Sequence, residues 1–213
     1  MKFHIFAAAV TCVLATPAHS EHLAPRNECG TLEGADAFQM ALVTAVANRN
    51  AEMLRPLVHP QVHLDFGGGR GWELMGERLQ SPDYDLWAEL DEVIRLGCDE
   101  GHEQSLVMPY YWGQDYGDLD AYGTYIVVGN KVPLYRSESS DRIVRNLSWE
   151  AVEFVSHFDS EEELDKAKRW EVKARDGARG FVDPTALREL VDFRLIAERE
   201  DGKWRITTFI AGD

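Results

Sequence analysis

The sequence predicts an α+β fold, with helices in its first half and short strands in its second. Three observations predict it. Apolar residues recur at helical spacing between residues 36 and 96, short alternating runs follow from residue 125, and an Asp-Gly turn separates two such runs near the C-terminus. Helical spacing places apolar side chains on one stripe of a helix, whereas alternation places them on one face of a strand. We therefore expect helices packed on a sheet, followed by a region made mostly of strands.

Helices are expected where apolar residues recur at helical spacing. One begins at Asp36, an N-cap signal, and runs to about residue 48. A shorter helix follows and ends near His59, because the residue before Pro60 avoids helical angles. Two more helices are expected over residues 72–79 and 86–96.

Strands are expected where apolar and polar residues alternate in short runs. The second half consists of such runs, interrupted by a charged insertion at 159–169 whose opposite charges at helical spacing suggest a solvated helical turn. The last two strands flank Asp201-Gly202, because Asp-Gly supplies the positive backbone angles of a two-residue hairpin turn. The expected strands cover residues 61–66, 105–112, 125–128, 132–136, 152–157, 170–174, 180–182, 192–200 and 203–210.

The first residues have the layout of a secretory signal peptide. A short basic region with Lys2 precedes an apolar run over residues 5–15, and small residues follow at Ala18 and Ser20. The apolar run is shorter than the roughly 20 residues that span a bilayer. We therefore expect residues 1–20 to be removed and the mature chain to be periplasmic or secreted, with no membrane insertion after cleavage.

Cys29 and Cys98 are the two cysteines that remain after such processing. Exported proteins keep disulfides because their compartments are oxidising. A disulfide is therefore expected, tying the N-terminal tail to the end of a helix. The chain has no C-x-x-C spacing, so neither a redox nor a metal role is indicated for the pair.

The chain is acidic, with 37 Asp and Glu residues, 22 Lys and Arg residues and a formal net charge of -15. Nucleic acids and anionic membrane surfaces attract basic proteins. The composition therefore argues against both as partners. A charge of this size is expected to keep an exported protein soluble.

Residues 123–190 contain a strand with an Arg-Ser turn at Arg136, a strand that begins at Trp170 and a Gly-aromatic-Val strand at Gly180. With these landmarks the segment resembles a bacterial SH3-like (SH3b) domain. It implies a small SH3-like β-barrel, of a kind associated with cell-wall targeting in exported bacterial proteins. The departures from the pattern are the insertion at 159–169, Tyr135 and Glu138. These departures change the surface on which the ligand groove implied by the resemblance would lie.

Residues 21–122 and 191–213 resemble an NTF2-like (SnoaL-like) domain. The resemblance rests on the two N-terminal helices, the strand at 63–66 with its Gly-rich exit and the Gly-x-Trp-x-Ile strand that begins at Gly202. It implies helices wrapped by a curved sheet, with the SH3-like module inserted and the C-terminal hairpin completing the sheet. The alternative, that this hairpin belongs to the SH3-like barrel, stays open.

His63 and Asp65 are the candidate catalytic pair. They share one face of the expected strand, where a carboxylate could orient an imidazole for acid-base chemistry. NTF2-like enzymes place such groups within the cone. The alternative is that both residues face solvent on a half-buried strand. No third convergent ligand can be named, so a metal site is not predicted.

Several aromatic residues are candidates for ligand binding, because aromatic rings can stack on sugars or clamp a peptide. The alternative is that these rings fill the core. The candidates are Tyr110, Tyr111, Trp112, Tyr135 and Trp149.

Signatures of common enzyme classes are missing from the sequence, including the Gly-x-Ser-x-Gly turn, the P-loop and His-Glu-x-x-His. We therefore expect a non-enzymatic exported protein without a cofactor, which binds a peptide, a cell-wall fragment or an envelope protein. The alternative function is an NTF2-like small-molecule binder or enzyme that uses His63 and Asp65.

Overall fold

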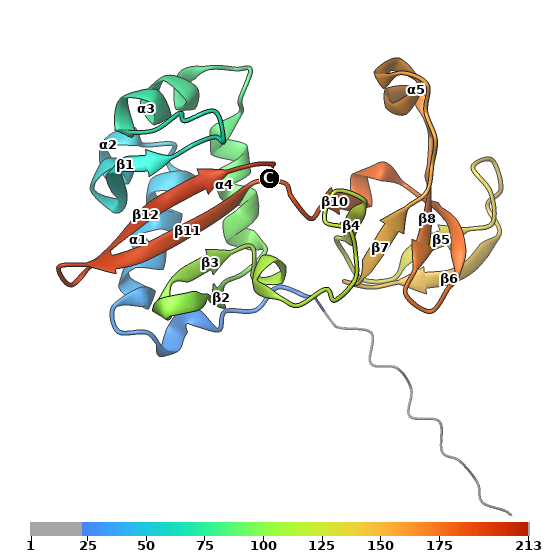
Figure 1. Ribbon diagram of the computed structural model, residues 1–213, viewed down its shortest axis with the longest axis horizontal. Coiled ribbons are helices and arrows are strands. Elements are labelled where there is room, and N and C mark those ends of the chain that lie inside the picture. Colours follow the sequence, from blue (N-terminus) through green and yellow to red (C-terminus); the bar gives the residue numbers. More distant parts are fainter. Residues whose placement is uncertain (1–22, 213) are drawn as a thin grey trace, which may run out of the picture.

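The computed structural model describes residues 23–212. They form two lobes, each built on its own β-sheet (Figure 1). The fold is therefore mixed α+β, which confirms the predicted class. The expected signal peptide at 1–20 lies outside the described residues. None of the described helices is long and apolar enough to cross a membrane.

The helices precede most of the strands along the chain. The α-helices are α1 (Ala35–Ala47), α2 (Ala51–Leu54), α3 (Trp72–Gln80), α4 (Leu86–Arg95) and α5 (Glu161–Lys166). The 3-10 helices are η1 (Cys29–Thr31), η2 (Arg55–Leu57), η3 (His102–Gln104), η4 (Tyr110–Gly113) and η5 (Pro184–Ala186). The strands are β1 (Val58–His63), β2 (Asp99–Glu100), β3 (Leu106–Met108), β4 (Thr124–Val127), β5 (Val132–Tyr135), β6 (Ile143–Leu147), β7 (Ala151–Phe154), β8 (Trp170–Ala174), β9 (Arg179–Val182), β10 (Leu187–Glu189), β11 (Arg194–Glu200) and β12 (Lys203–Ile210).

The C-terminal hairpin lies at the centre of the first sheet, whose strand order is β1-β12-β11-β3-β2. Strand β1 runs parallel to β12, and β11 pairs antiparallel with β3, where Leu195 faces Met108. The hairpin turn at Asp201-Gly202 points away from the second lobe (Figure 1). The first lobe is thus assembled from both ends of the described chain.

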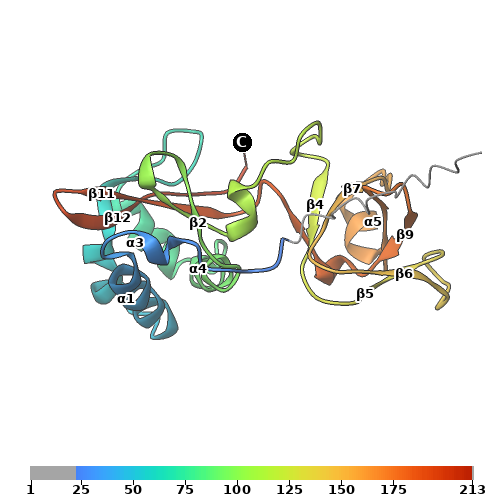
Figure 2. The same ribbon diagram turned by 90° about the horizontal axis from the view of Figure 1, so that it is seen from below.

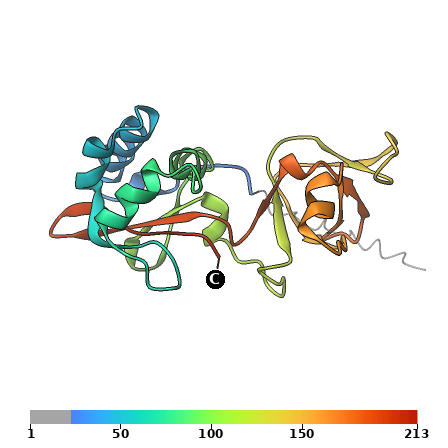
Figure 3. The ribbon, with the colours of Figure 1, turned by 90° about the horizontal axis from the view of Figure 1, so that it is seen from above.

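Helices α1 and α4 gather on one side of the first sheet, as the views from below and above show (Figures 2 and 3). Their apolar stripes bury Leu42 and Leu90 completely, against Phe209 of β12. Burying a side chain of this size stabilises the fold by about 1.5–3 kcal/mol. The space between helices and sheet is therefore a filled core.

The second sheet is open. Its strand order is β10-β4-β7-β8-β9-β5-β6, so β10 and β6 are its two edges and do not pair with each other. The expectation of a closed SH3-like barrel is therefore wrong at the level of strand pairing. The reason lies in β6, which pairs only with β5 and leaves Ile143 and Val144 exposed.

The two lobes meet at a third apolar cluster. It combines Leu96 and Tyr111 from the first lobe with Ile126 and Leu190 from the second. Next to it, Arg188 of β10 forms ion pairs with Glu89 and Glu92 of α4. The seam, which is this contact between the two lobes, therefore combines apolar packing with ion pairs.

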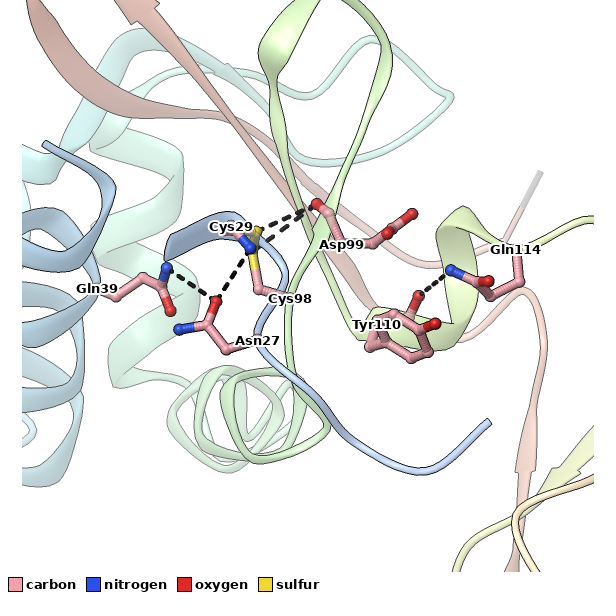
Figure 4. The surroundings of a disulfide bond; sticks show 7 residues. All are labelled: Asn27, Cys29, Gln39, Cys98, Asp99, Tyr110 and Gln114. Atoms are coloured by element: carbon pink, nitrogen blue, oxygen red, sulfur yellow. Dashed lines mark hydrogen bonds between the residues drawn. A yellow bond between two sulfur atoms is a disulfide. The ribbon is translucent and has the colours of Figure 1, made fainter. Parts of the chain in front are cut away.

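The disulfide between Cys29 and Cys98 is present, as predicted (Figure 4). The N-terminal tail runs beside the residues that follow α4, where the Glu28 amide donates to the Cys98 carbonyl at 2.9 Å. Gly97, with a φ of 89°, makes this approach possible, because a Cβ there would lie 2.4 Å from the Arg26 carbonyl oxygen. The bond therefore fixes the tail to the end of α4.

Several expected strands differ from the structure, and the one expected at 152–157 is β7, which ends at Phe154. The strand expected at 105–112 ends at Met108, because Pro109 turns the chain into η4. The strand expected at 61–66 is β1, Val58–His63, which begins earlier and leaves Asp65 in the turn that follows.

Candidate functional site

A pocket of about 390 Å³ lies beside Tyr135 on the second lobe. Tyr135 ends β5, whose preceding residue Leu134 is fully buried in the core, so the tyrosine points to the half-exposed side. Strand β9 approaches β5 closely at Gly180, where a Cβ would lie 2.5 Å from the Tyr135 carbonyl oxygen. The glycine thus allows the strand pairing that positions Tyr135.

Arg169 covers the ring of Tyr135, with its guanidinium carbon 3.5 Å from the ring centroid. The side chain is buried, and its nitrogens donate to the carbonyls of Glu138 and Ser140 at 3.1 and 2.7 Å. It also forms an ion pair of 3.1 Å with Asp141. Arg169 therefore holds the loop after β5 against Tyr135 and fixes this wall of the pocket.

Two exposed lysines stand at the pocket, Lys131 and Lys168. Neither has an ion-pair partner within residues 23–212. Lys131 has a φ of 57°, which is uncommon outside glycine, and its amide donates to Ser148 Oγ at 2.9 Å. The turn thus presents a lysine at the pocket.

Among the described residues, Asp183 is the one acidic residue that lines this pocket. Hydrogen bonds from Thr185 lower the pKa of Asp183, and the charge of Arg169 lowers it further. Its Oδ1 accepts from the Thr185 hydroxyl at 2.7 Å and from the Thr185 amide at 3.0 Å. The carboxylate is therefore ionised and already hydrogen-bonded, while the lysines keep the pocket net positive.

The lining of the pocket combines aromatic, apolar and charged side chains. The described residues that line it include neither histidine nor cysteine, and its threonine donates to the Asp183 carboxylate. What the pocket offers is an aromatic wall, the apolar ring of Pro133 and two free ammonium groups.

Trp149 lies apart from this pocket. It is half-buried and packs against the cluster at the seam between the lobes, with a φ of 46°. Its carbonyl oxygen accepts from the Leu23 amide at 2.8 Å, and its amide donates to the Gly129 carbonyl at 3.1 Å. Of the predicted pair in the second lobe, only Tyr135 lines the pocket.

The predicted aromatic run in the first lobe is divided between core and surface. Tyr110 and Tyr111 are buried, and burial raises the pKa of the Tyr111 hydroxyl. Trp112 lines a separate apolar pocket of about 200 Å³ at the seam, together with Tyr116. The guanidinium carbon of Arg194 lies 4.8 Å from the Trp112 ring centroid. The structure does not bring these residues to Tyr135.

His63 and Asp65 do not share an enclosed pocket. His63 is exposed at the end of β1. Asp65 forms an ion pair with Arg78 and accepts from the Gly69 amide at 2.7 Å. The Gly69 hydrogen bond and the Arg78 hydrogen bond lower the pKa of Asp65. Asp65 therefore serves to close the Gly-rich turn in this structure.

Sequence reasoning did not identify Arg169, Lys131, Lys168 or Asp183 as parts of the site. Arg169 belongs to the run of charges at 159–169, which carries no sign of its burial. Its only distinguishing signal is its position directly before Trp170, at the start of β8. Strand β9 pairs with both β8 and β5, and this tertiary arrangement brings Arg169 near Tyr135.

Comparisons with known proteins yield one structural similarity. No protein-family model matches the chain, and no curated protein matches it. A solved structure of an Rd1NTF2_05 variant, a designed NTF2-like protein, matches with a TM-score of 0.28 and 12% sequence identity. The match covers 84% of this chain and 96% of that chain. At this TM-score the similarity carries no argument about fold or function.

Proposed function

We propose that this protein is an exported, non-enzymatic binding protein whose second lobe is an SH3-like module. The observation that carries the proposal is the Tyr135 pocket, which combines an aromatic wall with two lysines that form no ion pair with any described residue. An extended peptide with carboxylate groups fits this chemistry. Its backbone would lie along Tyr135 and Pro133, and its carboxylates would meet Lys131 and Lys168.

The charge of the whole molecule strengthens this argument. The chain carries a formal net charge of -15, so two lysines that form no ion pair with a described residue are not the expected outcome of its composition. An exposed ion pair contributes about 0.2–1 kcal/mol. Two lysines without an ion pair among the described residues, placed beside one cavity, can therefore bind a negatively charged ligand.

Two further parts of the proposal rest on the sequence. The segment at 1–20 has the layout of a signal peptide, and the Cys29–Cys98 bond is of a kind that persists in oxidising compartments. The landmarks around Arg136, Trp170 and Gly180 support an SH3-like module in an open form. The helices and sheet of the first lobe are in turn compatible with an NTF2-like scaffold.

Binding can be tested with the purified mature chain and two probes, insoluble peptidoglycan and a soluble peptide of alternating Asp and Ala. The two probes distinguish a cell-wall stem peptide from an acidic protein segment as the source of the carboxylates. The variants are Tyr135→Ala and the double change Lys131→Gln with Lys168→Gln. We expect the double variant to bind about fivefold more weakly, the effect of roughly 1 kcal/mol.

Arg179→Gln is the matched control, because Arg179 is an exposed residue of the same lobe that does not line the pocket. It removes one positive charge and should leave binding within twofold of the parent. Failure of the parent protein to bind either probe would overturn the proposal. If Arg179→Gln weakened binding as much as the double variant, the effect would come from the positive charge of the whole lobe and not from the pocket.

A further inference from the structure

Two cavities adjoin at the far end of the first lobe, next to β1. One has a volume of about 380 Å³ and the other about 490 Å³. They share Arg55, Val58 and Pro60 in their walls, so they form one trough with Arg55 between its halves. Strands β1 and β12 lie in the first lobe, whereas β5, which ends at Tyr135, lies in the second (Figure 1).

Positive side chains are concentrated in this trough. Arg55 and Arg70 line the first cavity, and Lys203 and Arg205 line the second with Arg55. Two carboxylates, those of Glu52 and Glu73, also line it, which leaves an excess of two positive charges. This excess stands against a chain whose formal net charge is -15.

Most of these cations have no internal partner. Arg205 lies 4.0 Å from Glu200, while Arg55, Arg70 and Lys203 form no ion pair within residues 23–212. Elsewhere in the same lobe, Arg78 pairs with Asp65, Arg95 with Asp91 and Arg199 with Glu33. Unpaired cations of one sign repel each other across a cavity. A bound anion would relieve that repulsion.

We propose that this trough binds a small organic phosphate, with the phosphate dianion between Arg55 and Arg70. Guanidinium groups are suited to phosphate because their donors match its oxygens in pairs. A phosphate monoester carries a charge of about -1.5 to -2 at neutral pH, which matches the positive excess. The half-buried ring of Trp72 in the first cavity supplies an apolar wall for the organic part.

The size of the ligand follows from the charge outside the trough. A long polyanion would extend beyond the trough along a molecule whose formal net charge is -15, and would be repelled there. A molecule confined to the two cavities would meet mainly the cations. The site does not depend on the peptide-binding function proposed for the other lobe.

The test is calorimetric titration of the mature chain with glucose 6-phosphate, with inorganic phosphate and with glucose. We expect glucose 6-phosphate to bind, inorganic phosphate to bind more weakly and glucose not to bind. Equal affinity for both phosphates would assign the site to free phosphate and overturn the organic part of the proposal. The absence of any phosphate binding at millimolar concentration would overturn it entirely.

Variants locate the site. Arg55→Gln and Arg70→Gln are each expected to raise the dissociation constant for glucose 6-phosphate about tenfold, equivalent to about 1.4 kcal/mol. Arg49→Gln is the matched control, because Arg49 is exposed in the same lobe, forms no ion pair with a described residue and lines neither cavity. Thermal melting would verify that each variant is folded. Equal effects of all three changes would contradict a defined site.

Discussion

Arg188 of β10 lies with its Nη1 atom 2.6 Å from Oε2 of Glu92 on α4, and so links the second lobe to the first. Its other terminal nitrogen lies 3.5 Å from Glu89 and 3.4 Å from Asp192. Only 6% of Arg188 is exposed. A single buried guanidinium thus contacts three carboxylates at the seam between the lobes.

Replacing Arg188 with methionine is expected to lower the free energy of unfolding by about 3 kcal/mol, because it leaves carboxylates without their counter-charge. We place the loss at the low end of the range for buried pairs since the carboxylates themselves are partly exposed. Urea denaturation measures it. Arg95→Met, which removes an exposed pair with Asp91, should cost less than about 1 kcal/mol. Similar losses of unfolding free energy in both variants would show that the buried ion pairs of Arg188 stabilise the protein no more than an exposed pair does.

Glu89 should make the stability of the seam depend on pH. Burial raises its pKa above the ordinary value of 4.5, and the charge of Asp192 raises it further, against the lowering effect of Arg188. The folded state therefore holds this proton more tightly than the unfolded state, and the cost of the charge is present in full above the folded-state pKa. That cost is relieved as the pH falls through the folded-state pKa.

Glu89→Gln mimics the protonated residue. We expect the variant to be at least as stable as the parent at pH 7. Any excess in its free energy of unfolding over that of the parent should shrink as the pH is lowered toward 4.5. Chemical denaturation at a series of pH values gives the comparison. A variant that is less stable at pH 7 and regains parity at low pH would have the opposite sign and contradict this prediction.

The disulfide should stabilise the folded protein by restricting the unfolded chain between the two cysteines. Cys29 and Cys98 are separated by 69 residues, for which the chain-entropy relation gives about 4 kcal/mol at most. Replacing both with alanine should therefore lower the urea midpoint substantially under oxidising conditions. Under a reductant the parent and the variant should converge. A difference that survives reduction would assign the loss to packing around Cys29 instead.

Gly180 should resist substitution although it lies in a regular strand. A Cβ there would lie 2.5 Å from the Tyr135 carbonyl oxygen and 2.7 Å from Cγ of Leu134. Gly180→Ala is expected to cost about 1–3 kcal/mol, as overpacking does, and to weaken peptide binding because Tyr135 must move. Thermal melting and the peptide titration measure the two effects.

Gly76→Ala provides the contrast. Gly76 lies inside α3, and a Cβ there would meet nothing within 4 Å. Alanine should therefore stabilise the protein by roughly 0.5–1 kcal/mol, the helical preference over glycine. If both alanine variants were stabilised, the close approach of β9 to β5 would not be a constraint on the fold.

Local pattern was sufficient for several elements. The helix predicted at 36–48 is α1, Ala35–Ala47, and the Asp201-Gly202 turn connects β11 and β12. These succeeded because helical spacing and turn chemistry are properties of neighbouring residues. The prediction of a strand at 105–112 was wrong beyond Met108, because Pro109 changes the backbone direction. Apolar residues lie on both sides of Pro109, so the local pattern did not reveal this change.

The mixed fold class, the disulfide pair and the acidic charge could be predicted from the sequence alone, because they depend on composition and local pattern. Whether the second sheet closes, and which aromatic residues reach the surface, depends on three-dimensional packing. Closure depends on whether the distant edges β6 and β10 pair, and the Tyr135 pocket depends on Arg169, which the chain reaches only after α5. Such contacts join residues far apart along the chain, and their energies come from packing and charge that no local run of residues contains.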